Sequence, residues 1–370
     1  MRLGDCCKTN LHTYSDKEKW SLIRYLDTGS ITEGRIDEIQ TLYPGVDKIP
    51  SRARRKASVG DILFSTVRPN QKHYGIIEAG TENLLVSTGF TVVTVDTTIA
   101  DPYFIYYYLT QSSVIESLQA IAEQSTSTYP SIKPSDIEDI ELDLPELETQ
   151  KKIGSTLRML DRKIALNEEI NDNLQQQAFS VFDNLIANAE NNDYTVSDYA
   201  FLNPKRRLAK NQVARSIDMS QLSTRGAFPS SWEIKPFNGG MRFTNGDTLL
   251  ARITPCLENG KTAFIDFLDD GEVAFGSTEY IVLAPKNDTP PEMLYCLARY
   301  PAFVDYAVKN MNGSSGRQRV SAETVGQYRL PLFDKHSLVL FKEVVSPMFL
   351  KMRYNFLENM RLAEPVSYTH

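Results

Sequence analysis

Side chains that can hydrogen-bond to the edges of DNA bases gather in four short polar stretches of this chain. Arginine, asparagine, glutamine, serine and threonine supply the donors and acceptors that distinguish one base pair from another in the major groove, and they serve best on loops held by a rigid scaffold. The candidates in the first half of the chain are Arg68, Asn70, Gln71, Lys72, His73, Ser125, Thr126, Ser127, Tyr129 and Lys133. Those in the second half are Arg252, Asn259, Lys261, Ser314, Ser315, Arg317, Gln318 and Arg319.

Basic residues also cluster close to these stretches. Arg54 and Arg55 lie in one basic run, and Arg206 and Arg207 lie in another near the start of the second half. Phosphate contacts use such cations, so we predict that these four arginines hold the DNA backbone. The alternative for each run is an ordinary solvated surface, and the net charge of −7 argues mildly against a nucleic-acid partner.

Sequence motifs that would give the chain chemistry of its own are incomplete. Asp101-Pro102-Tyr103-Phe104 is similar to the loop with which amino-methylating enzymes grip a flipped base, but its second proline is absent. Residues 312–317 lack the Gly-Lys-Ser/Thr that ends a phosphate-binding loop. The four cysteines and four histidines show no metal-ligand spacing. We therefore predict no catalytic residue, no metal site and no cofactor in this chain.

Two matching apolar seams indicate the elements that position the candidate residues. Both seams step by four and three residues, which is typical of a coiled coil, and both carry asparagine at the same two positions. The first consists of Ile153, Leu157, Leu160, Ile164, Asn167, Asn171 and Leu174. The second lies 188 residues later and consists of Phe341, Val345, Met348, Met352, Asn355, Asn359 and Leu362. An asparagine inside such a seam fixes register and orientation, so we expect the two helices to pack on each other antiparallel.

The repeat extends beyond the helices. Gly60-Asp61 before an apolar run is matched by Gly246-Asp247, and the apolar stretch 87–93 is matched by 277–283. Such fragments are ordinary turn-and-strand chemistry one by one, but together they keep their order along both halves. The sequence therefore predicts a duplicated mixed α+β module with pseudo-twofold symmetry.

Hydrophobic periodicity divides the chain into four parts. We predict a first mixed domain over residues 1–145, a long helix over 146–192, a second mixed domain over 193–333, and a second helix with the C-terminal tail over 334–370. Within the first domain, residues 84–95 read as one buried strand, 104–118 as a helix and 137–144 as a short strand. Pro347 predicts a kink or a late start in the second helix.

Composition is that of a globular protein without a membrane partner. Hydrophobic residues make up 41% of the 370 residues and charged residues 24%, and no apolar run is long enough to span a bilayer. The N-terminal residues lack the apolar region of a signal peptide. The scattered cysteines fit reduced thiols. We therefore expect a cytoplasmic location.

At this point the sequence resembles the specificity subunits of type I restriction–modification systems. Residues 60–66 resemble the strand of each target-recognition domain in that family. The passage from 137–145 into Glu148-Thr149-Gln150 resembles the family's entry into its conserved helix, whose signature is similar to Leu160-Asp161, Ile164, Asn167, Ile170-Asn171 and Leu174. The second helix departs from the pattern, because residues 333–337 lack a glutamine corresponding to Gln150.

This resemblance implies a non-catalytic reader of double-stranded DNA. Each mixed domain would bind one half of a split target, and the helices would hold the halves at a fixed spacing. Two methyltransferase subunits would dock on the chain and carry S-adenosylmethionine for adenine methylation. Restriction subunits that use ATP and Mg²⁺ to translocate DNA would join them.

Two other functions remain open from the residues alone. One is a protein-binding scaffold in which the coiled coil is an assembly arm, which explains the acidic composition better. Its interface should resist salt, whereas DNA binding through phosphates weakens steeply as salt rises. The other is a self-contained DNA methyltransferase, which would require the isolated chain to bind the methyl donor.

Overall fold

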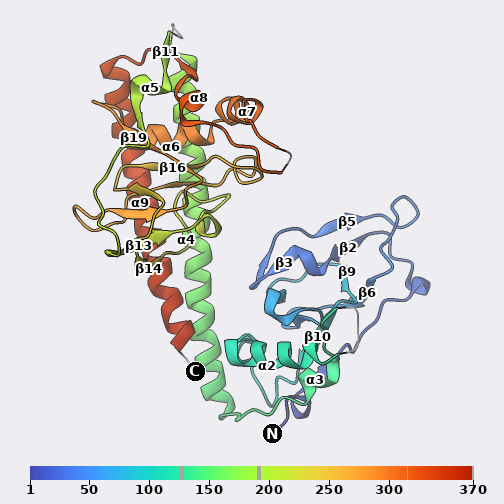
Figure 1. The fold of residues 1–370 in the computed structure, drawn as a ribbon. Helices are drawn as coiled ribbons and strands as arrows, with labels where there is room; N and C mark the ends of the chain where they lie inside the picture. The colour runs from blue at the N-terminus through green and yellow to red at the C-terminus, as the bar shows by residue number, and fades with distance from the viewer. Residues whose placement is uncertain (126–128, 190–192, 315, 369–370) are drawn as a thin grey trace. The chain divides into compact units, whose positions relative to one another are not determined.

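The fold is described from a computed structural model, which describes residues 1–125, 129–189, 193–314 and 316–368. The chain forms two compact units (Figure 1). The first comprises Met1–Arg162 with the segment from Glu364 onward, and the second comprises Lys163–Ala363. Each unit contains its own pair of four-stranded sheets and its own buried apolar core.

The first unit is built on two small sheets followed by helices. One sheet has the order β1-β10-β7-β8, with β1 at Cys7–Thr9, β10 at Phe90–Val95, β7 at Ile62–Ser65 and β8 at Tyr74–Ile76. The other has the order β5-β2-β9-β6, with β5 at Gln40–Leu42, β2 at Ile23–Leu26, β9 at Leu84–Ser87 and β6 at Ala53–Lys56, and a hairpin joins β3 (Ile31–Thr32) to β4 (Arg35–Ile36). The helices are α1 (Pro102–Leu109), α2 (Ser112–Glu123), α3 (Pro134–Glu138) and the start of α4 (Leu147–Ala187).

The second unit has the same plan. Its first sheet has the order β12-β19-β16-β17, at Ala200–Leu202, Tyr280–Pro285, Thr248–Ala251 and Thr262–Phe264. Its second has the order β14-β13-β18-β15, at Glu233–Pro236, Val213–Ile217, Ala274–Gly276 and Met241–Phe243, and β11 (Tyr194–Thr195) pairs with β20 (Arg329–Leu330). Its helices are α5 (Val196–Tyr199), α6 (Pro291–Arg299), α7 (Pro301–Lys309), α8 (Ala322–Gly326) and α9 (Lys335–Tyr368).

The pairing of the strands confirms the predicted duplication. In each unit all eight strands of the two sheets meet their neighbours in the same order, and one parallel pair joins otherwise antiparallel partners. That pair is β2 with β9 in the first unit and β13 with β18 in the second. Parallel strands cannot be joined by a tight hairpin, so the same crossover in both units indicates one repeated topology rather than two similar sheets.

The repeated Gly-Asp motif is a turn that precedes a buried strand. Gly60 and Gly246 both have φ of +88°, a left-handed conformation that glycine adopts without strain. The following aspartate accepts a backbone N–H three residues earlier, from Ser58 to Asp61 at 2.7 Å and from Thr244 to Asp247 at 2.8 Å. Both carboxyl groups are buried. The motif therefore sets the entry into β7 and β16.

The start of α1 accounts for the methylase-like segment. The Asp101 side chain accepts a hydrogen bond from the backbone N–H of Phe104 at 2.9 Å, and Pro102 occupies the first helical position. Both features are standard at helix N-termini. The segment caps a helix.

The two seams pack against each other as the asparagines predict (Figure 1). Asn167 donates to Asn359 Oδ1 at 2.8 Å, and Asn355 donates to Asn171 Oδ1 at 2.8 Å. Residue numbers rise along one helix and fall along the other, so α4 and α9 are antiparallel. Shifting either pair by the 188-residue repeat gives the other pair. Phe341, Val345 and Met352 are buried in this contact, whereas Ile153, near the start of α4, is 39% exposed.

We expect a single substitution in one asparagine pair to destabilise the chain more than the double substitution. Asn355→Leu removes the donor to the Asn171 carbonyl, and a polar group deprived of its partner costs about 1–3 kcal/mol. Combining it with Asn171→Leu replaces the pair by apolar contact, which recovers the loss. Urea unfolding midpoints of the wild type and the two variants measure this. A double variant as unstable as the single one would contradict the role of the pair.

Four predicted boundaries are wrong. Residues 84–95 form two strands, β9 and β10, which belong to different sheets. Residues 104–118 are divided between α1 and α2, and residues 137–144 contribute to α3 and one isolated bridge instead of a strand. The first long helix ends at Ala187 rather than near 192. The second begins at Lys335, one residue after its predicted start, and is continuous through Pro347, with Val345 and Phe349 buried on either side of the proline.

Candidate DNA interface

The candidate residues lie mainly on two loops that the first unit brings together. The chain leaving β7 forms an isolated bridge between Val67 and Ser131. Ile132 N–H donates to Thr66 O at 2.9 Å, and Arg68 N–H donates to Pro130 O at 3.0 Å. Backbone hydrogen bonds therefore join residues 66–68 to residues 130–132, although the two segments are far apart in sequence.

The second unit repeats this arrangement. The chain leaving β16 bridges through Ile253 to Arg319. Val320 N–H donates to Arg252 O at 3.0 Å, and Thr254 N–H donates to Gln318 O at 3.1 Å. We call the two hydrogen-bonded segments of each unit its loop pair: residues 66–68 with 130–132 in the first unit, and 252–254 with 318–320 in the second. The two loop pairs share the same backbone hydrogen bonding and differ in their side chains.

In the first loop pair, Arg68 is an exposed cation that lies beside an aromatic ring. It is left-handed at φ +49°, and its guanidinium lies 5.3 Å from the ring centre of Tyr129, which is 58% exposed. Stacking on an aromatic ring limits the positions of an arginine. Asn70, Gln71 and Lys133 are exposed on the same segments. These side chains are placed to meet a ligand in solvent.

Other candidates in the first unit already have partners. Lys72 forms an ion pair with Glu33 at 2.5 Å, and both side chains are about half exposed. His73 Nδ1 lies 2.6 Å from Ile31 O, which ties the imidazole to the hairpin. Ser125 Oγ accepts from Ser131 N–H at 3.3 Å. Thr126 and Ser127 lie outside the described residues.

The second loop pair is centred on an acid. Glu279 accepts from Arg319 through Nε at 2.9 Å and Nη2 at 2.7 Å, and from Arg252 Nε at 3.2 Å. The hydrogen bond from Arg319 is the main reason that the pKa of Glu279 lies below its usual value. Asn259, Ser314 and Arg317 are exposed around this group, Gln318 is half-buried, Lys261 Nζ donates to Met219 O at 2.8 Å, and Ser315 lies outside the described residues.

The four predicted phosphate contacts differ in their surroundings. Arg207 is exposed, and Arg54 is half-buried. Burial lowers the pKa of Arg55, whose Nη1 has no hydrogen-bond partner among the described residues. Arg206 forms an ion pair with Asp247, whose side chain is 1% exposed. The ion pair holds that guanidinium against the protein, which favours a structural role, whereas Arg207 is exposed.

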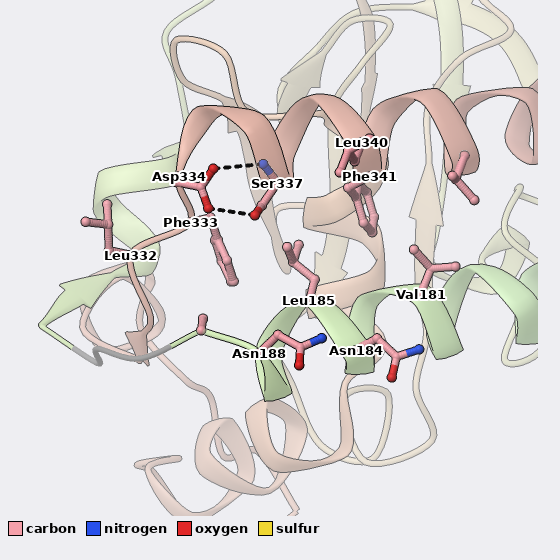
Figure 2. Close-up of a pocket in the computed structure, with 12 residues that line it drawn as sticks. Val181, Asn184, Leu185, Asn188, Leu332, Phe333, Asp334, Ser337, Leu340 and Phe341 are labelled. Carbon is pink, nitrogen blue, oxygen red and sulfur yellow. Dashed lines mark hydrogen bonds between the residues drawn. The ribbon is translucent and has the colours of Figure 1, made fainter.

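The sequence patterns did not indicate the roles of two acids, Glu279 and Asp247, or the presence of one apolar groove. Glu279 and Asp247 lie 40 and 41 residues from the arginines that they bind, and no local pattern signals such pairs. The apolar groove, of about 640 Å³, lies at one end of the helix pair. Figure 2 shows Leu185 and Val181 of α4 facing Phe341 and Leu340 of α9 across this groove. Asp334 caps α9 at its edge by accepting from Ser337 N–H at 3.0 Å.

The described part of the chain holds neither a metal cluster nor a membrane-spanning helix. No group of three or more His, Cys, Asp or Glu side chains there is placed to hold a metal ion. None of the helices in the same residues is both long and apolar enough to span a membrane.

Comparison with known proteins finds similarity to type I restriction–modification specificity subunits. The model of the type I restriction modification DNA specificity domain matches residues 48–176. The specificity subunit of the type I restriction enzyme HindI of Haemophilus influenzae is 30% identical over 180 residues, which is 49% of this chain and 39% of that protein. That of EcoAI from Escherichia coli is 34% identical over 133 residues, or 34% of this chain and 22% of that protein. The aligned parts thus span less than half of these relatives.

A solved structure extends the similarity to the whole fold. The S subunit of the type I restriction-modification system of M. genitalium superposes with a TM-score of 0.56 at 16% identity, covering 99% of this chain and 93% of that one. At this identity the match supports the fold, with its two sheet-based domains and long paired helices. Residues 48–176 therefore match the type I restriction modification DNA specificity domain, and the chain as a whole shares the fold of this S subunit.

Proposed function

We propose that this chain reads a bipartite DNA sequence and directs adenine methyltransferase and restriction subunits to it. The observation that carries the proposal is that each unit has a loop pair. The two loop pairs have the same backbone hydrogen bonding but present different side chains. Two DNA-binding surfaces with the same backbone but different side chains suit a target whose two halves differ in sequence. The fixed helix pair then suits a target with a constant gap between its halves.

The domain division follows the same reasoning. We propose that residues 1–145 and 193–333 are the two target-recognition domains, and that 146–192 and 334–370 are the spacer helices. Helix α4 has 41 residues and α9 has 34. At 1.5 Å per residue they are roughly 60 and 50 Å long, longer than one small domain requires.

Surface charge supports DNA as the ligand in spite of the acidic composition. Arg68 is exposed on the first loop pair and Lys133 beside it, Arg317 is exposed beside the second, and Arg207 is exposed elsewhere on the second unit. Cations at such positions displace the counterions of the phosphate backbone, which gives affinity that falls as salt rises. The local distribution of charge matters more for a binding surface than the net value.

The apolar groove between α4 and α9 supports docking of a methyltransferase subunit. Leu332, Leu340 and Val344 line it and are 46%, 47% and 47% exposed. Large apolar side chains gathered in a concave surface are typical of the centre of a protein interface. The methyl donor, ATP and Mg²⁺ would be carried by the methyltransferase and restriction subunits.

The proposal predicts that removing this gene erases methylation at one split sequence. Adenine methylation would be mapped across the genome in cells with the gene, without it, and with the gene restored. We expect one motif with a fixed gap between its halves to disappear on deletion and to return on restoration. A methylation map that is the same in all three cells would contradict the reader function.

A further inference from the structure

The second loop pair contains a group of three charged side chains with no counterpart in the first. Arg252, Glu279 and Arg319 come from the end of β16, the turn before β19 and the loop before α8. Their side chains are 31%, 24% and 36% exposed, so the group lies at the surface without being freely solvated. Two positive charges and one negative charge leave it net positive, which suits a position against DNA.

Hydrogen bonding divides the two arginines into different roles. Arg319 uses Nε and Nη2 on Glu279, and its Nη1 donates to Arg317 O at 3.0 Å. All three of its nitrogens are therefore engaged. Arg252 contacts Glu279 through Nε alone, and within the described residues its Nη1 and Nη2 have no hydrogen-bond partner. The end of Arg252 that carries the two amino groups is the part of this cluster left for a ligand.

The free end of Arg252 has the chemistry that recognises guanine. Two parallel N–H donors match the O6 and N7 acceptors of guanine in the major groove, and this is the commonest specific contact between proteins and DNA. Such readout requires a fixed guanidinium plane, which an acid bound at Nε provides while leaving the amino groups exposed. Arg319, held at all three nitrogens, keeps Glu279 in place.

The equivalent positions in the first unit carry Thr66, Gly89 and Ser131. The backbone is the same: Thr66 N–H donates to Gly89 O at 2.8 Å where Arg252 N–H donates to Glu279 O at 3.0 Å. A side chain at Gly89 would place its Cβ 2.8 Å from Thr28 Cγ2, which is too close without movement. An acid at this position in the first unit would require Thr28 to move, and the group of three charged side chains is found only in the second loop pair.

We propose that Glu279 is a positioning residue that orients Arg252 to read a guanine in the half-site bound by the second unit. Arg319 holds the Glu279 carboxylate in place. The inference deepens the proposed function and rests on it. It assigns base discrimination at one G·C pair to Arg252 and makes the acid necessary for that discrimination. Replacing the acid should therefore reduce selectivity without reducing general affinity for DNA, because a negative charge is removed.

The test uses the chain assembled with its methyltransferase subunits. Glu279→Gln keeps the size of the side chain but removes its negative charge and one of its two acceptor oxygens, and Arg252→Lys keeps the charge but loses the paired donors. We expect each variant to lose roughly tenfold discrimination at the same G·C pair of the second half-site. The first half-site should stay as strict as in the wild type, and Glu279→Gln should bind unrelated DNA at least as tightly. Glu258→Gln, an exposed acid in the same loop, is the matched charge control and should change neither.

Methylation maps and binding to duplexes with single base-pair changes separate the outcomes. Suppose that the wild-type map shows a split motif, and that Glu279→Gln discriminates between bases in the second half-site as well as the wild type does. This result overturns the present inference and leaves the proposed function standing. Uniform loss of affinity for all sequences, or a lowered unfolding midpoint, shows a merely structural role and also overturns it. Absence of any split motif in the wild type overturns the proposed function and this inference with it.

Discussion

Arg206→Ala is expected to destabilise the second unit by about 3–5 kcal/mol, because it leaves a buried carboxylate without its counter-ion. The Asp247 side chain is 1% exposed, and its remaining hydrogen bond comes from Thr244 N–H at 2.8 Å. This aspartate closes the turn that leads into β16, so the damage should spread to the base of the second loop pair. Urea unfolding followed by circular dichroism measures the loss.

Two further variants show whether the cause is the orphaned charge. Combining Arg206→Ala with Asp247→Asn removes the charge and keeps an acceptor for Thr244 N–H, so most of the stability should return. Arg207→Ala changes the exposed neighbour, and we expect an unchanged midpoint but a salt dependence of DNA binding that is lower by about one unit of slope. If Arg206→Ala unfolds at the wild-type urea concentration, the ion pair contributes little and the arginine is available to phosphate.

Charged residues in the apolar groove are expected to abolish assembly with the methyltransferase subunit. Leu340→Glu combined with Val344→Glu places two carboxylates where we propose that a partner's apolar side chains dock. Central apolar contacts of an interface contribute about 2 kcal/mol or more each, so affinity should fall by roughly a hundredfold or more. Both positions are 47% exposed on α9, and glutamate is a good helix former, so the chain itself should stay folded.

Copurification of the tagged chain with its methyltransferase subunit measures this effect. Leu350→Glu is the matched control, since Leu350 is 44% exposed on the same helix and does not line the groove. We expect the control to assemble as the wild type does. Normal assembly of the double variant would rule out the groove as the docking site, and equal loss in the control would move the interface along α9.

Sequence patterns predicted the helix pair better than the sheets. A heptad with two matched asparagines identifies a seam, its partner and its orientation, because few other arrangements satisfy buried amides. The stretch 84–95 carries no comparable signal for its division between two sheets. Its β-branched residues are buried except for Thr88 and Thr94, and only the packing of the whole unit decides that one strand ends at Ser87 and the next begins at Phe90.

The same limit applies to the candidate interface. The loops were found from their residue types, but the sequence could not separate Arg252 from Arg319 or Arg206 from Arg207. Those differences depend on Glu279 and Asp247, which reach the arginines only in the folded chain. Apolar exposure in the groove is likewise a property of two helices together. Whether each predicted residue touches DNA stays a prediction.

The reciprocity of the asparagine pairs has an evolutionary consequence. Each half of the chain carries both the asparagines and the apolar seam that the other half requires, because the two contacts exchange under the internal repeat. Recombination that replaces one half with the corresponding half of a related gene would therefore preserve the seam. New combinations of recognition modules can arise in a single genetic event, with no compensating change in the helices that join them.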